Sequence, residues 1–372
     1  MSLEPPSYKS LDEKTTRRLL ALFTGERTGW VQVGEKKWFF PHRYVEQGSH
    51  FFNFKARPDD TWVVSYPRSG TTWTQELVWL ICNDLDFDTA RKVHLTERFP
   101  FLEISLCTHP QVIDELVDAV KDNPELAARC RQVAEPGYQV LQRLSSPRFI
   151  KSHFPFSLLP GVLDVGCKIN RNAFSCHHCD LKQVNRVSLC KMKQYSVVYV
   201  ARNPKDVAVS WFHLNRIFKT QGYQGDFPTF WSCFRDDLTT WSPYWEHLKE
   251  AWALRDDPNL LFLFYEDMNM DLPKTIDRVA KFLGKNLTRE QTFNLVDYLD
   301  FNRFKRNGTV NGEELKECGV ITTTSFIRKG QSGGWTDTFT PELEADADQW
   351  IAENLKDTDF SFPILNNNDN KY

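Results

Sequence analysis

Short apolar runs recur along the chain, and each is followed by a polar cluster and then by a helical pattern. The runs are rich in β-branched and aromatic residues, which predicts buried strands. They lie at residues 62–66, 148–150, 197–201 and 260–265. Strands this apolar, separated by helices, are typical of a parallel sheet covered on both faces. We therefore expect an α/β fold: one domain over 1–372, with a central parallel sheet flanked by helices.

Helical periodicity follows three of these strands and returns near the C-terminus. It predicts one helix that begins at Thr71 and a second that follows residues 202–206 and runs to about Ile217. Two further helices are predicted over 272–283 and over 341–355. Residues 110–142 are also mostly helical in pattern, and we expect them outside the sheet as a lid or flank. Residues 297–334 are rich in Gly, Asn, Thr and basic side chains, which predicts a loop.

The first strand turns abruptly into its helix within 66–73, Y-P-R-S-G-T-T-W. A helix that begins this way exposes free backbone N–H groups and the positive end of its dipole. Arg68 and three hydroxyl side chains share the turn, so it predicts an anion cradle, most simply for phosphate. The nucleotide P-loop motif is absent, because no Lys follows Gly70. The alternative is an ordinary strand–helix corner capped by Ser and Thr.

Two further clusters have the same chemistry. Arg202 ends a strand, Asn203 and Pro204 suit a helix start, and Ser210 lies two turns later. The third cluster, 328–330, has Gly-rich flanks that allow close approach to a ligand. A capped helix with a surface Arg and a solvated loop are the respective alternatives. Because ligands bind beyond the carboxyl ends of parallel strands, we expect the clusters to gather at one edge. Three anion sites suggest a ligand with several phosphate-like groups.

His153 stands at the end of a predicted strand, two residues after Lys151. A neutral histidine there could take a proton from an acceptor hydroxyl, and the lysine could stabilise developing negative charge. The alternative is a partly buried structural histidine. No H-E-x-x-H or G-x-G-x-x-G motif is present, which excludes zincins and Rossmann dehydrogenases.

Composition narrows the partners and the compartment. The net charge of −3 argues against a general nucleic-acid binder, and no apolar window is long enough to span a membrane. Nine cysteines without framework spacing or a secretory signal predict free thiols in a reducing, cytoplasmic setting. The cluster 176–179, C-H-H-C, suggests zinc, but adjacent ligands cannot all reach one tetrahedral ion, so we expect no metal.

The segment 169–196 has no clear periodicity and interrupts the approach to the strand at Val197. Without it, Lys168 would join Val197 directly and give a clean strand, V-G-C-K-V-V-Y-V-A-R. The segment is therefore interpreted as an atypical insertion, with a translated intron or a splice variant as the hypothesis. Transcript sequencing that finds no shorter form would contradict the intron hypothesis.

Taken together, the motifs resemble those of the cytosolic sulfotransferases, over about 50–335. They are Y-P-R-S-G-T-T-W at 66–73, K-S-H-F-P at 151–155, Y-V-A-R-N-P-K-D-V-A-V-S at 199–210, F-Y-E-D-M at 264–268 and R-K-G at 328–330. Residues 75–85 resemble the insect branch that includes retinol dehydratase. The resemblance implies a P-loop-like fold and the cofactor 3′-phosphoadenosine 5′-phosphosulfate (PAPS), whose product is the bisphosphate PAP.

The resemblance also implies roles for individual positions. His153 would be the general base and Lys151 would steady the sulfuryl oxygens, with Arg68 as the third catalytic residue. Phe101 and Phe154 would lie in the acceptor pocket, although core packing is the competing interpretation for both. The cofactor would be held by Arg68, Ser69, Gly70, Thr71, Thr72 and Trp73 at its 5′ end, by Arg202, Ser210, Arg328, Lys329 and Gly330 at its 3′-phosphate, and by Trp73, Tyr265, Phe301 and Phe304 at its adenine.

Three features of the sequence depart from the family pattern. Arg68 replaces the usual Lys; it keeps the charge but cannot donate a proton at neutral pH. Leu299 stands where a hydroxyl residue is common near the adenine. The C-terminal dimer motif K-x-x-x-T-V-x-x-x-E is degenerate, because Thr336, Pro341 and Ala345 replace its Lys, Val and Glu, so a family-style dimer is not predicted.

The leading hypothesis is transfer of the sulfuryl group to a hydroxyl of a small apolar acceptor, phenolic, steroid-like or isoprenoid. The alternative reaction is elimination of the retinol dehydratase type through a transient sulfate ester. A non-catalytic homologue that binds the cofactor or a ligand is the third hypothesis, suggested by Arg68 and the insertion.

Overall fold

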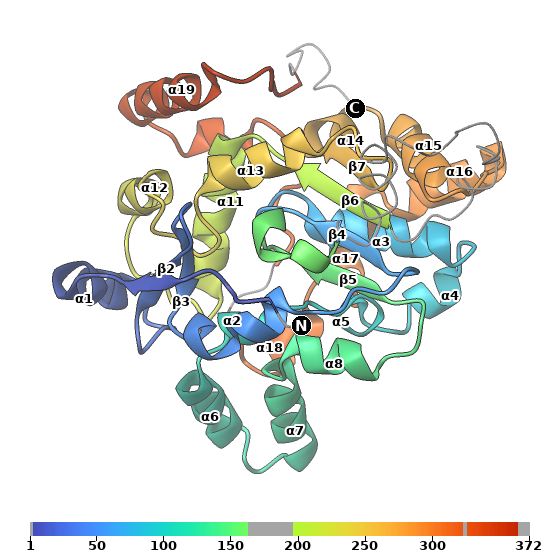
Figure 1. Cartoon of the computed structure of the whole chain (residues 1–372). Coiled ribbons are helices and arrows are strands. Elements are labelled where there is room, and N and C mark those ends of the chain that lie inside the picture. The colour runs from blue at the N-terminus through green and yellow to red at the C-terminus, as the bar shows by residue number, and fades with distance from the viewer. Residues whose placement is uncertain (1–2, 163–195, 323–325, 364–372) are drawn as a thin grey trace, which may run out of the picture.

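The computed structural model describes residues 3–162, 196–322 and 326–363 (Figure 1). Its strands are β1 (Tyr8–Ser10), β2 (Trp30–Val33), β3 (Trp38–Pro41), β4 (Thr61–Val64), β5 (Phe149–Ser152), β6 (Ser196–Ala201) and β7 (Leu260–Phe264). Its helices are α1 (Glu13–Leu22), α2 (Tyr44–Phe52), α3 (Thr71–Cys82), α4 (Phe87–Ala90), α5 (Leu95–Arg98), α6 (Pro110–Ala119), α7 (Pro124–Val133), α8 (Gly137–Arg143), α11 (Pro204–Ile217), α12 (Phe227–Arg235), α13 (Tyr244–Ala253), α14 (Tyr265–Met270), α15 (Leu272–Phe282), α16 (Arg289–Tyr298), α17 (Phe301–Arg306), α18 (Glu313–Glu317) and α19 (Pro341–Leu355). None of the described helices is long and apolar enough to cross a membrane.

The central sheet has the order β5-β4-β6-β7, and all three pairings are parallel. Each of the four predicted strands is present, within one or two residues of its expected ends. Register places Val63 beside Lys151 on β5 and beside Val198 on β6. The carboxyl ends of the strands therefore lie at one edge, which confirms the predicted α/β class.

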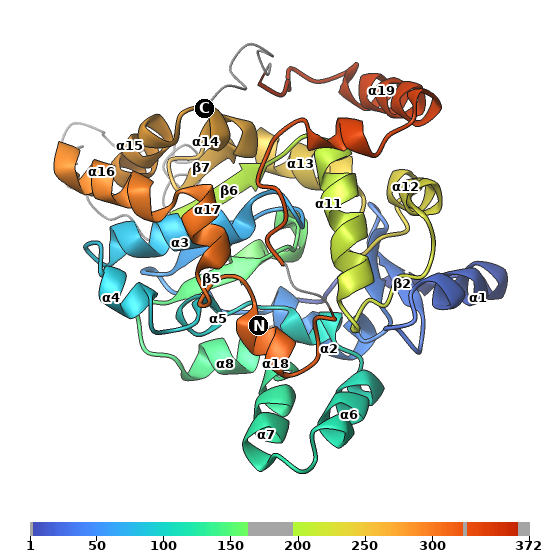
Figure 2. The same ribbon diagram turned by 180° about the vertical axis from the view of Figure 1, so that it is seen from behind.

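Alternate residues of these strands are buried on opposite faces. Trp62 and Tyr199 belong to the larger hydrophobic cluster, whereas Val63 and Val198 belong to a second cluster with α3, α15 and α16. Both faces are thus covered, as the apolar strand sequences predict. Figure 2 shows α3, α15, α16 and α17 on the same side of the molecule.

The N-terminal part forms a separate antiparallel sheet that the sequence interpretation did not anticipate. Its order is β1-β2-β3, with Val31 opposite Phe40. Trp38, Phe39 and Phe40 are all buried in the larger cluster. A continuous apolar run of this length does not show the period-two alternation that marks a half-exposed strand.

The region 110–142 is helical, as expected, and lies outside the central sheet. Helices α6 and α7 form a hairpin that projects from the body in both views (Figures 1 and 2). A small cluster of its own, including Leu116 and Cys130, packs the hairpin against Cys318 and Val320 beyond α18. The hairpin is therefore tied to the segment that leads into the 328–330 loop.

The prediction of a loop at 297–334 is wrong, because this region contains the end of α16 and the whole of α17 and α18. Asp300 starts α17 by accepting the N–H groups of Asn302 and Arg303, and Gly312 starts α18 with a φ of +77°. These capping signals lie within a polar sequence without hydrophobic periodicity. The predicted insertion 169–196 lies outside the described residues except for Ser196, the first residue of β6, and so does the cluster 176–179.

Candidate active site

The turn between β4 and α3 is built from two left-handed residues. Arg68 has a φ of +69° and Gly70, the N-cap of α3, has a φ of +97°. A Cβ added to Gly70 would lie 2.4 Å from Cδ2 of Tyr265, so the tyrosine ring packs directly on the turn. Glycine is therefore required here both by conformation and by contact.

Three arginines gather beside this turn. Nε of Arg68 donates to Oγ of Ser210 at 2.9 Å, and Nη1 of Arg202 donates to the carbonyl of Arg68 at 3.1 Å. Burial, together with Arg202 and Arg328, lowers the pKa of Arg68 to about 10, and burial and Arg202 lower that of Arg328. Within the described residues, none of the three forms an ion pair. An anion placed here would relieve their mutual repulsion.

Two buried polar atoms at the same place have no partner in the part of the chain that the structure describes. They are Oγ of Ser69 and Nε of Arg202. Buried polar groups in folded proteins are almost always hydrogen-bonded, so unpaired donors beside a cationic cluster fit a site for an anionic group. The donor set fits a ligand that carries more than one phosphate.

The 328–335 loop is fixed to the start of α11. The carboxylate of Asp206 accepts the N–H groups of Gly333, at 2.7 Å, and of Trp335, at 3.1 Å. Nη2 of Arg202 donates to the carbonyl of Gln331 at 2.9 Å. Lys329 pairs with Asp337. The second and third predicted anion clusters are thus brought together, as expected from the sheet topology.

Aromatic side chains surround the arginines. The rings of Trp73 and Tyr265 meet at 65° with centroids 6.0 Å apart, and Cζ of Arg202 lies 4.3 Å from the centroid of Tyr265. Phe301 packs so closely on Gly330 that a Cβ there would lie 1.9 Å from its Cε2. Leu299 is buried, and its carbonyl accepts the indole N–H of Trp73. The backbone at 299 thus positions one of the predicted adenine contacts.

His153 is buried at the end of β5, with a defined tautomer. Its Nδ1–H donates to the carbonyl of Ser65 at 2.7 Å, since a carbonyl only accepts, and this leaves Nε2 as the basic nitrogen. The ring meets Phe101 and Trp241 edge-on, with centroids 5.2 and 5.3 Å away. Burial and the nearby Lys151 hold the pKa of His153 well below its usual value. The imidazole is therefore neutral at physiological pH.

Lys151 lies beside His153 on the same strand end. Its Nζ is 4.2 Å from the centroid of the Phe101 ring. Burial, with a smaller contribution from Arg68, lowers the pKa of Lys151 to about 8. The ammonium group is consequently a poorly solvated charge that can neutralise at mildly alkaline pH.

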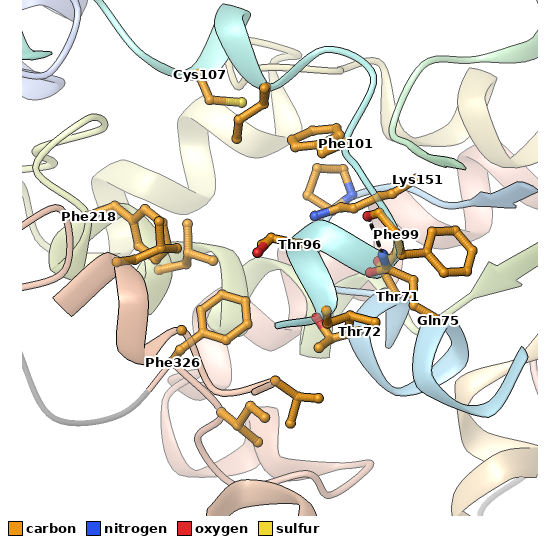
Figure 3. Close-up of a pocket in the computed structure, with 18 of the residues that line it drawn as sticks. Thr71, Thr72, Gln75, Thr96, Phe99, Phe101, Cys107, Lys151, Phe218 and Phe326 are labelled. Atoms are coloured by element: carbon orange, nitrogen blue, oxygen red, sulfur yellow. Dashed lines mark hydrogen bonds between the residues drawn. The ribbon is translucent and has the colours of Figure 1, made fainter. Parts of the chain in front are cut away.

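These residues line one cavity of about 700 Å³ (Figure 3). Every residue predicted for the cofactor, catalytic or acceptor site lines it except Ser69 and Phe154. Ser69 is buried within the turn itself. The expectation that Phe154 lies in the acceptor pocket is wrong. Its side chain is fully buried and packs on Phe40 and Phe51 in the core, with ring centroids about 5 Å away. The competing interpretation, core packing, holds for this residue.

The cavity residues that the sequence interpretation missed include four aromatic or thiol side chains. Trp241, whose φ is +72°, packs against His153, and Cys107, Phe218 and Phe326 line the opposite walls (Figure 3). All four come from segments without a recognisable motif, so no local signal marks them. Phe326 also covers Arg68, with Cζ 5.1 Å from its ring centroid.

Comparison with known proteins places the chain in a family. A family model described as "Sulfotransferase domain" matches residues 58–169 and 178–359. The luciferin sulfotransferase of Photinus pyralis is 32% identical over 336 residues, which cover 89% of this chain and 81% of that protein. Human sulfotransferase 4A1 is 30% identical over 310 residues, 83% of this chain and 85% of the other.

Solved structures agree. The structure of retinol dehydratase in a complex with retinol and PAP superposes with a TM-score of 0.83 at 37% identity, covering 97% of this chain and 99% of that one. Retinol dehydratase with androsterone and PAP gives a TM-score of 0.82 at the same identity. The cofactor is therefore PAPS, and the non-catalytic hypothesis is not supported. The chain belongs to the sulfotransferase family and is a sulfotransferase enzyme.

Proposed function

We propose that this chain transfers the sulfuryl group of PAPS to the hydroxyl of a small apolar acceptor, with His153 as the general base. The observation that carries the proposal is the tautomer of His153, whose Nδ1–H is bound to Ser65 while the residue lines the cavity. Nε2 is left to accept the hydroxyl proton. Lys151 and Arg68, which line the same cavity, supply positive charge beside it.

The cofactor subsites follow from the cationic cluster. When bound, PAPS supplies the activated sulfuryl group. The β4–α3 turn, from Arg68 to Trp73, would hold its 5′ end, and Arg202, Ser210 and the 328–330 loop would hold the 3′-phosphate. The hydrogen bond from Arg68 to Ser210 joins the two subsites. Because Arg68 cannot give up a proton at neutral pH, its help to the leaving group would be electrostatic.

A stability measurement tests the two phosphate subsites. At 100 times its dissociation constant, PAP should add about 2.7 kcal/mol of stability, which appears as a raised melting temperature. 5′-AMP and ATP serve as controls, since neither carries a 3′-phosphate. Arg328→Gln should remove most of the advantage of PAP over 5′-AMP. An equal shift with PAP and 5′-AMP in the native protein would contradict a 3′-phosphate subsite.

The acceptor half of the cavity supports an apolar acceptor of the steroid-like or isoprenoid kind. Phe101, Trp241, Phe218 and Phe326 are among its lining residues. The retinol dehydratase structures hold retinol and androsterone, two apolar alcohols. Elimination of the retinol dehydratase type is the second candidate reaction, favoured by the 37% identity over nearly the whole chain. Mass spectrometry of the product from retinol separates a sulfate ester from a dehydrated hydrocarbon.

The lowered pKa of Lys151 predicts an alkaline limit to activity. The charged form exists below about pH 8, so kcat/KM for PAPS should fall as pH rises through that value, by about tenfold per pH unit. Lys151→Arg keeps the charge at all these pH values and should abolish this limb. Lys151→Met should be slow across the whole range. An unchanged limb near pH 8 in Lys151→Arg would exclude Lys151 as its origin.

The compartment stays a proposal. In the described part of the chain, Cys107, Cys130, Cys233 and Cys318 are free thiols. They agree with the reducing, cytoplasmic setting expected from the sequence.

A further inference from the structure

We infer that His247 is a positioning residue for the reaction: through a hydrogen bond to the backbone carbonyl of His153 it holds the catalytic imidazole in its reactive orientation. The inference rests on the proposed role of His153 as general base. His247 lies on α13, far from His153 in sequence, and it is fully buried behind the active site.

Every polar group of His153 other than Nε2 is engaged. Its backbone N–H donates to Oε1 of Glu103 at 2.5 Å, and its Nδ1–H donates to the carbonyl of Ser65. Its backbone carbonyl accepts Nε2–H of His247 at 3.0 Å. The residue is therefore fixed at three points from three different parts of the chain, and among residues 3–162, 196–322 and 326–363 only the nitrogen proposed to react has no hydrogen-bond partner.

The tautomer of His247 is itself fixed. The hydroxyl of Tyr199 donates to Nδ1 of His247 at 2.8 Å, which leaves the proton on Nε2, where it faces His153. Burial lowers the pKa of His247 to about 4, so this ring is neutral in the working pH range. Trp38 and Tyr66 meet it edge-on, at 89° and 88°, and prevent the ring from tilting.

The two hydrogen bonds that connect Tyr199 to His247 and His247 to His153 link the active site to the centre of the sheet. Tyr199 lies on β6 and His153 follows β5, while β4 lies between these two strands. Loss of the His247 donor would leave a buried carbonyl unpaired, which favours rotation of the His153 backbone. A displacement of about 1 Å at a catalytic group can cost on the order of 100-fold in rate.

The test compares two substitutions at one position. His247→Gln places an amide N–H donor near the position of Nε2–H, whereas His247→Leu keeps similar bulk without a donor. We expect kcat of His247→Leu to fall about 10- to 100-fold while the dissociation constant of PAP stays within about threefold. His247→Gln should recover most of the loss. Recovery by the donor, with PAP binding unchanged, is a result that a purely structural role would not produce.

A third variant keeps the test decisive if His247→Leu fails to fold. Tyr199→Phe removes only the hydroxyl that fixes the His247 tautomer, and it should lower kcat about fivefold without altering the dissociation constant of PAP. If His247→Leu does not fold, a Tyr199→Phe variant whose kcat stays within about twofold of the native value would overturn the inference. So would a His247→Leu variant that folds and turns over at the native rate.

The inference and the proposed base fail in different ways. If His153→Ala is inactive while folded His247 variants are fully active, the inference alone falls. If His153→Ala keeps its turnover, the proposed base falls first, and the inference falls with it.

Discussion

Replacement of His153 by alanine should lower kcat by about 10²- to 10⁴-fold, the range that general base catalysis typically contributes. Binding of PAP should stay within about threefold of the native protein, because His153 makes none of the contacts that link the cationic cluster. His153 Nε2 is the basic nitrogen of a buried, neutral ring, so its loss removes the proton acceptor rather than a charge. Single-turnover rates with PAPS and a phenolic or steroid alcohol would measure the effect.

A second histidine that lines the cavity provides the matched control. His94 also lines it, but its Nδ1 faces Oε2 of Glu314 at 2.9 Å, at the junction of α5 and α18. His94→Ala should keep kcat within about twofold. Comparable losses in both variants would indicate a general disturbance of the cavity, and an active His153→Ala would exclude the residue as the base.

The sequence predicted the part of the fold in which pattern and chemistry agree locally. The strands ending at Val64 and Ala201 are apolar on both faces, and Asn203 and Pro204 give an unmistakable helix start. Because parallel strands end at one edge, the convergence of their polar clusters needs no knowledge of tertiary structure. The same argument placed His153 and Lys151 beside the cationic cluster.

Other features depend on contacts between distant segments. Trp241 packs against His153 and has a φ of +72°, a conformation that nothing in its sequence marks. Phe154 directly follows His153, yet it points into the core among Phe40, Tyr44 and Phe51. Neighbouring positions at a strand end face opposite ways, so proximity in a motif did not decide between pocket and core.

Replacement of Gly70 by alanine should weaken PAP binding by about 30-fold or more. The residue has a φ of +97°, where a side chain costs about 1–2 kcal/mol, and the new Cβ would lie 2.4 Å from the ring of Tyr265. Overpacking of this kind adds about 1–3 kcal/mol. A total cost of about 2 kcal/mol or more, expressed in the free energy of PAP binding, corresponds to a loss of affinity of about 30-fold or more. Titration calorimetry with PAP is the measurement.

Gly284 separates the two causes. Its φ is +71°, but a Cβ there would meet nothing within 4 Å. Gly284→Ala should therefore cost only the backbone strain, lower the melting temperature by a few degrees at most, and leave the affinity for PAP unchanged. If both variants bind PAP equally well, close packing at the β4–α3 turn does not shape the cofactor site.

The ring of Tyr265 connects this turn to the rest of the site, and a double substitution can show it. The ring cannot move freely away from a new Cβ, because it is buried under Arg202 and against Trp73. A shift forced on it would displace both neighbours. In a Tyr265→Ala background, Gly70→Ala should lower the affinity for PAP no more than Gly284→Ala does, since only the backbone strain is left. Additive losses would mean that the turn fails for conformational reasons alone, whereas non-additive losses would show that the tyrosine transmits the change to the arginine and the tryptophan.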